Sequence, residues 1–247
     1  MFEIFLSLFN TNLLAAALIA ALSGVMHGYT GFGAALFMVP LLTLLFGPVD
    51  AIVLMVVIAI FGSAQLYPRA ASNAQWRQLI PVILAVTFST PLGVYLLFSL
   101  DADTVRRAMG GFVLLAALIL MSGWVYKGPR GIVASMIAGG LSGVVNGSTG
   151  VGGPPLAIYF LSAPSPPAVQ RANIVIAVTT IVSISLVSLI VAGAVDGEAF
   201  MRGLVLIPAY VAGTWFGSYL FTIAPQEYFR RVALWLLLVT GVGILFL

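Results

Sequence analysis

The chain has 247 residues, of which 62% are hydrophobic and only 7% charged, and its mean hydropathy is +1.17. A soluble domain carries about 25% charged residues, so this composition excludes a water-soluble protein and predicts an integral membrane protein. The net charge of +3 concerns orientation in the membrane rather than nucleic acid, and the absence of cysteine excludes disulfides, thiol redox chemistry and cysteine-bound metal.

The apolar runs of the first half, 1–126, predict a hairpin of two short helices followed by three spanning helices. Runs of about 20 residues indicate helices, since strands of a membrane barrel are about 10 residues long and alternate. Two helices too short to cross comfortably flank a break at 27–32 and form a hairpin over 12–47. The three spans are predicted at 51–67, 79–100 and 104–125.

The second half, 127–247, repeats this order. A hairpin over 132–163 contains a break at 146–155, and spans follow at 168–194, 200–221 and 228–247. The segment SGVVNGSTGVG (142–152) matches SGVMHGYTGFG (23–33) at seven of eleven positions, with His27 opposite Asn146. Later pairs such as Thr90 and Thr214 also match. The sequence therefore predicts an all-α membrane protein built by internal duplication, each half being a broken-helix hairpin plus three transmembrane helices.

The basic residues distinguish two arrangements of the short helix pairs. If each pair crosses the membrane as one broken helix, five basic residues lie on each side. If each pair returns to its starting side as a hairpin, seven lie on one side and three on the other, in keeping with the positive-inside rule. Each half then crosses the membrane an odd number of times, so we expect two inverted repeats with both termini outside.

The two breaks predict an anion site near the middle of the membrane. Non-helical backbone at that depth is tolerated only inside protein or beside a water-filled cavity. A helix that begins after such a break directs free N–H groups and a positive dipole end into the cavity, where transporters with inverted repeats bind substrate. The alternative is that the glycines are packing contacts between helices. The candidate binding residues in the breaks are Gly28, Tyr29, Thr30, Gly31, Gly33, Asn146, Gly147, Ser148, Thr149, Gly150, Gly152 and Gly153.

Three further polar residues are candidates for the same site. His27 is the only histidine, and it either titrates and binds the anion or acts as a neutral donor that holds the break together. With one histidine and no cysteine no metal site is predicted, and no cofactor is predicted, since GSTGVGG lacks the lysine of a P-loop. Arg171, with Asn173 beside it, is either the fixed positive charge of the anion site or a cation that extends to the membrane surface.

Two segments, HGYTGFGAALFMVPLL (27–42) and GGLSGVVNGSTGVGGPPLAIYF (139–160), resemble the TauE/SafE family of sulfite exporters, as do the duplicated layout and the length. The resemblance implies a multi-pass protein of the bacterial cytoplasmic membrane that transports a sulfur-containing anion such as sulfite, thiosulfate or an organosulfonate. Ala34 and Ala35 stand where the second copy has Gly153 and Pro154, so the two half-sites are expected to differ.

The favoured function is a secondary transporter that exports its anion by alternating access, with the lipid bilayer as its other partner and a proton or counter-ion left open. An anion channel with the same midplane site is the alternative. An enzyme is disfavoured, because one histidine, no cysteine and seven acids, mostly in loops, supply neither a nucleophile–base pair nor a metal cluster. A scaffold protein would show no stabilisation by substrate. The oligomeric state is not predicted.

Overall fold

The computed structural model describes residues 11–223, 235, 238, 239, 241 and 242. Across this part of the chain the secondary structure is entirely helical, with nine helices, and seven of these are long and apolar enough to cross a membrane. The predicted all-α integral membrane protein is thereby confirmed. The last predicted span, 228–247, falls almost wholly outside the described residues.

The helices follow the predicted order. Those of the first half are α2 (Thr11–Thr30), α3 (Ala34–Phe46), α4 (Pro48–Asn73), α5 (Trp76–Ser99) and α6 (Ala102–Met121). Those of the second half are α7 (Ile132–Thr149), α8 (Gly153–Leu161), α9 (Pro167–Val191) and α10 (Gly197–Ile223). Local signals set several starts: Pro48 and Pro167 open their helices, where a missing N–H costs nothing, and Asp101 caps α6 by accepting from the Thr104 N–H at 2.8 Å.

Both breaks are shorter than predicted. The helices α2 and α7 continue through the segments 27–30 and 146–149, so the non-helical residues are only 31–33 and 150–152. Each helix ends at a glycine with positive φ, 79° at Gly31 and 74° at Gly150. The N–H groups of these glycines donate to the carbonyls of His27 and Asn146 at 2.8 Å. A left-handed glycine is a common C-terminal cap, and because of it each break begins four residues later than predicted, at 31 instead of 27 and at 150 instead of 146.

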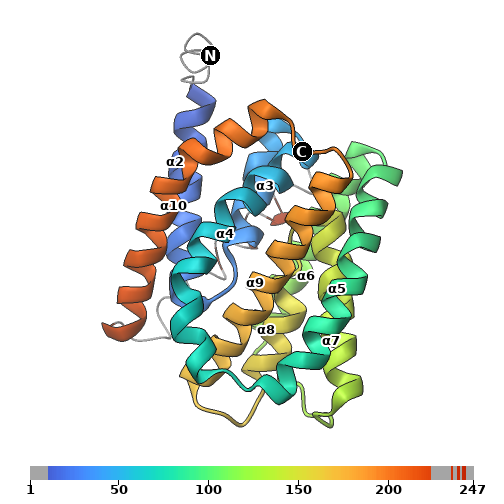
Figure 1. The fold of residues 1–247 in the computed structure, drawn as a ribbon, viewed down its shortest axis with the longest axis vertical. Helices are drawn as coiled ribbons and strands as arrows, with labels where there is room; N and C mark the ends of the chain where they lie inside the picture. The colour runs from blue at the N-terminus through green and yellow to red at the C-terminus, as the bar shows by residue number, and fades with distance from the viewer. Residues whose placement is uncertain (1–10, 224–234, 236–237, 240, 243–247) are drawn as a thin grey trace.

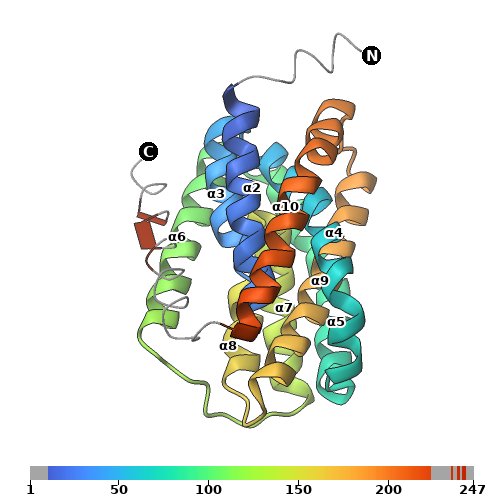
Figure 2. The ribbon, with the colours of Figure 1, turned by 90° about the vertical axis from the view of Figure 1, so that its left-hand side faces the viewer.

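The hairpins enter from opposite ends of the molecule (Figures 1 and 2). The helix α2 begins at the end that carries the N-terminus and α3 returns to it, whereas α7 begins at the other end and α8 returns there. The first half of α4 lies between them, with every residue from 51 to 59 buried. The predicted hairpins are thus present, and their opposite directions support inverted repeats, which stay a prediction.

Each hairpin packs against a spanning helix of the other half. The Gly28 Cα of α2 lies against the Thr214 carbonyl of α10, so close that an added Cβ would overlap it. In the same way Gly147 of α7 lies against the Thr90 carbonyl of α5. Gly28 and Gly147 are equivalent by the duplication, as are Thr90 and Thr214. The same contact therefore occurs twice with the partners exchanged between the halves, which is further support for the duplication.

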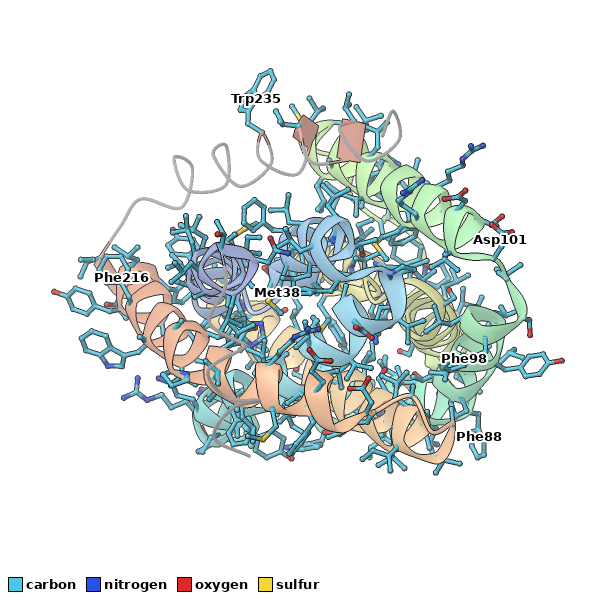
Figure 3. All side chains as sticks on the ribbon, turned by 90° about the horizontal axis from the view of Figure 1, so that it is seen from above. Met38, Phe88, Phe98, Asp101, Phe216 and Trp235 are labelled. Atoms are coloured by element: carbon cyan, nitrogen blue, oxygen red, sulfur yellow. The ribbon has the colours of Figure 1, made fainter. Side chains whose placement is uncertain are left out.

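The outer surface is apolar around the bundle. Seen along its long axis, Phe88, Phe98 and Phe216 point outward while Met38 lies in the middle (Figure 3). The side chain of Phe88 is 79% exposed, whereas that of Met38 is fully buried. Large exposed aromatic and aliphatic side chains on this scale would be a liability in water, but they suit contact with lipid.

The charges divide between the two ends. The end at which α4, α6 and α10 begin carries all the acids among the described residues, together with three arginines. The opposite end carries only cations within the described part of the chain, namely Arg69, Arg77, Lys127, Arg130 and Arg171. By the positive-inside rule this cation-rich end is expected to face the cytoplasm.

This orientation can be tested by cysteine labelling, because the natural chain has no cysteine. A membrane-impermeant maleimide added to intact cells is expected to label an Asp103→Cys variant, since Asp103 lies at the acidic end. A Lys127→Cys variant should react only after the cells are permeabilised, because Lys127 lies at the cation-rich end. The reverse labelling pattern would show that the molecule is inserted the other way.

Candidate functional site

A small cavity lies where the two breaks meet. Its volume, measured as space for the centres of water-sized spheres, is about 20 Å³, which is room for about one water molecule. Both hairpins and the spanning helices α4, α9 and α10 contribute to its wall. The lining residues are His27, Phe32, Gly33, Ala34, Ala35, Met55, Ala59, Asn146, Gly153, Val178, Ile181, Val182 and Tyr210. The structure therefore brings together parts of the two segments that the sequence singled out.

Asn146 is the residue that holds the second break in place. Its side chain is buried, its Nδ2 donates to Ser185 Oγ of α9 at 2.9 Å, and its Oδ1 accepts from the Gly152 N–H at 3.2 Å. One amide thus joins α7, the break and α9. Because both bonds are buried, losing either would leave a polar group without a partner, which costs about 1–3 kcal/mol.

His27 and Tyr210, which both line the cavity, carry polar atoms without a hydrogen-bond partner among the described residues. His27 Nε2 and the Tyr210 hydroxyl are both buried and make no hydrogen bond with the described residues. Their ring centroids lie 6.0 Å apart. Buried polar groups are almost always paired, so we take these two atoms as candidate contacts for a bound ligand.

Backbone donors also face the cavity. The first residues of α3, Ala34 and Ala35, and the first residue of α8, Gly153, line it. Their N–H groups form no hydrogen bond within the described part of the chain, as expected for a first helical turn. Pro154 and Pro155 follow in the first turn of α8 and have no N–H to leave unpaired. Two helix starts, each with a positive dipole end, therefore meet at one point.

The glycines of the breaks divide into three groups. Gly33 and Gly153 line the cavity, whereas Gly28 and Gly147 lie against neighbouring helices, which is the packing role considered as the alternative. The remaining three shape the turns. Gly31 and Gly150 cap their helices, and Gly152 donates to Asn146. The expectation that the whole segment from 150 to 153 offers free donors is therefore wrong at Gly150 and Gly152, whose N–H groups are already bonded.

The hydroxyls and the tyrosine of the breaks lie away from the cavity wall. Thr30, Ser148 and Thr149 each donate to a carbonyl one turn earlier in their own helix. Tyr29 is buried and meets Phe221 of α10 edge-on, with ring centroids 5.7 Å apart. These residues support the ends of α2 and α7.

Arg171 and Asn173 hold helix ends rather than lining the cavity. Arg171 donates to the Gly28 carbonyl near the end of α2, and its guanidinium lies 4.5 Å from the centroid of the Phe221 ring. Asn173 is fully buried, and its Oδ1 accepts from the Gln75 N–H at 2.7 Å, next to the start of α5. The structure thus places both at the cation-rich end of α9, with Arg171 against Gly31 of the first break and Asn173 beside the start of α5.

Tyr210 and Ser185 are site residues that the sequence did not single out. Each lies inside a long apolar span with no neighbouring motif, and the position equivalent to Tyr210 is Val86. The packing of α10 on the hairpin of the other half brings Tyr210 near the first break, whereas α9 meets the second break within its own half. No cluster of three or more histidine or acidic side chains suited to a metal occurs among the described residues.

A protein family described as sulfite exporter TauE/SafE matches residues 16–244, nearly the whole chain. No curated protein and no solved structure matches the chain.

Proposed function

The chain belongs to the sulfite exporter TauE/SafE family, and on this premise we propose that it is a secondary transporter. Its substrate is a small sulfur-containing anion such as sulfite, thiosulfate or an organosulfonate, and its location is the bacterial cytoplasmic membrane. A membrane transporter of this family accounts for the apolar helices and for the absence of any catalytic constellation in the residues described.

The observation that carries the proposal is the cavity at which two helix starts meet. Free N–H groups of Ala34, Ala35 and Gly153 border it, together with the unpaired polar atoms of His27 and Tyr210. Helix N-termini are ready-made anion sites, and no acid among the described residues lines the cavity to repel an anion. In this proposal the bound anion accepts hydrogen bonds from these donors.

The size of the cavity favours a transporter over a channel. Sulfite has four heavy atoms, whereas the cavity holds about one water molecule. The site must therefore enlarge to admit its substrate, which is expected of a carrier that alternates between closed and open states. An open channel needs a continuous polar path instead.

The direction of transport follows from charge. A membrane potential of 100 mV, negative inside, is worth about 2.3 kcal/mol for each elementary charge, so a dianion leaves the cytoplasm with about 4.6 kcal/mol in its favour. Export therefore needs no second ion. This energetic balance favours export.

Transport in proteoliposomes tests the proposal. Vesicles that contain the purified protein and a high internal concentration of sulfite are expected to take up labelled external sulfite by exchange, and empty vesicles should not. Thiosulfate and a short sulfonate, offered as competitors, would rank the substrates. Flux that is fast, passive and without exchange would favour the channel, and an absence of flux for every sulfur anion would refute both.

A further inference from the structure

A second polar hollow lies at the cation-rich end, apart from the central cavity. It has a volume of about 470 Å³ between the last turns of α4 and α10, which is large enough for an oxyanion with its hydration water. Its polar wall consists of Gln65 and Arg69, one turn apart on α4, and Ser218 and Thr222, one turn apart on α10. The rings of Trp215 and Tyr219 stack along the same face of α10, with their centroids 6.4 Å apart.

Within the described part of the chain, no acid lines the hollow or pairs with its positive charge. The side chain of Arg69 is exposed and makes no hydrogen bond or ion pair with the described residues. Arg171 of α9 also lies next to the hollow, since its Nη2 lies 3.5 Å from Ser218 Oγ. The three ion pairs of the described chain all involve Arg106 or Arg202, at the opposite end.

We propose that this hollow is a second oxyanion site, in which an anion from the cation-rich side is held before it moves to the central cavity. Arginine binds the oxygens of sulfite, sulfonate or phosphate in a planar fork, and Arg69 supplies that fork at the rim. Gln65 on α4 and Ser218 on α10 supply a neutral donor on each wall.

The inference rests on the proposed function for its substrate, and Arg171 is the link between the two sites. The same guanidinium that contacts Ser218 also donates to the Gly28 carbonyl of α2. Its Cγ lies 3.4 Å from the position that a Cβ on Gly31 would occupy. Arg171 therefore stands between the hollow and the first break. An anion that draws it toward Ser218 weakens its bond to α2 and frees that helix end to move.

An Arg69→Gln variant tests the assignment. The KM for sulfite is expected to rise about tenfold, because the variant loses a charge-assisted hydrogen bond to the anion, while kcat stays within about twofold since Arg69 does not line the central cavity. The matched control is Arg77→Gln, which removes an exposed positive charge from the same end without touching the hollow. Equal shifts of KM in the two variants would show that the effect comes from the loss of positive surface potential at this end. That result would overturn the proposal.

Crystals soaked in selenite separate this inference from the proposed function. The anomalous signal of selenium is expected between Arg69 and Ser218 in the natural protein and in the Arg77→Gln variant, and to vanish in Arg69→Gln. Selenium in the hollow without transport of any sulfur anion would support the site and refute the transporter. Transport of a sulfur anion without selenium in the hollow would support the transporter and refute the second site. If phosphatidylglycerol displaces the selenium, the hollow is a lipid headgroup pocket and the proposal fails.

Discussion

An Asn146→Asp variant is expected to fold normally and to lose sulfite transport by at least about 100-fold. The aspartate oxygens can still accept from the Gly152 N–H and from the Ser185 hydroxyl, which takes the place of the amide donor in that bond. These two donors favour the ionised carboxylate. The change therefore preserves the joint between α7, the break and α9 and adds one negative charge to the cavity wall.

The size of the effect follows from Coulomb's law. Two unit charges 4 Å apart interact by about 4 kcal/mol at an effective dielectric constant of 20, and sulfite carries up to two. For a dianion the repulsion is therefore about 8 kcal/mol, and even half of it exceeds the roughly 2.7 kcal/mol that corresponds to 100-fold. Exchange of labelled sulfite in proteoliposomes gives the rate, and thermal unfolding in detergent reports the fold.

Asn146→Ala separates charge from structure. It leaves Gly152 N–H and Ser185 without their partner, so the free energy of unfolding should fall by about 2–4 kcal/mol, whereas Asn146→Asp should lie within about 1 kcal/mol of the natural protein. An Asn146→Asp protein that transports sulfite at the natural rate would mean that the anion does not pass this cavity, and the proposed site would have to be abandoned.

The sequence was sufficient to predict the hairpins, because glycine at matched places in an apolar chain has few explanations. It was insufficient to predict where the helices end. Each helix ends where a glycine, Gly31 or Gly150, adopts the left-handed conformation. The sequence alone does not indicate which of several neighbouring glycines does so. Gly28 and Gly147 have the same spacing in the motif but serve helix contact.

For a different reason, the sequence could not predict all the residues that line the cavity. His27 and Asn146 could be found from the duplication, since both copies place a polar side chain one turn before the capping glycine. Tyr210 could not, because its contribution depends on α10 crossing over to the hairpin of the other half. Arg171 could be located near the breaks but not oriented, and the structure directs it to the Gly28 carbonyl.

A Gly147→Ala variant is expected to lower the free energy of unfolding by about 2–4 kcal/mol, a cost typical of overpacking against a rigid neighbour. The new methyl group would overlap the Thr90 carbonyl and lie 2.6 Å from the Val94 nitrogen, and backbone of α5 cannot rotate aside as a side chain can. The helix α7 must then move away from α5 and carry Asn146 with it, so transport should fall as well.

The matched control lies two turns earlier in the same helix. Gly140 has nothing within 4 Å of an added Cβ, so Gly140→Ala should be neutral or stabilising by up to about 1 kcal/mol, as alanine is the better helix former. Gly28→Ala, which meets the Thr214 carbonyl, should resemble Gly147→Ala, because the contact is repeated with the halves exchanged. Thermal unfolding of all three in one detergent measures the difference. If Gly147→Ala and Gly140→Ala unfold alike, α7 and α5 do not touch at Gly147. The glycines at 28 and 147 must then be explained by the anion site instead.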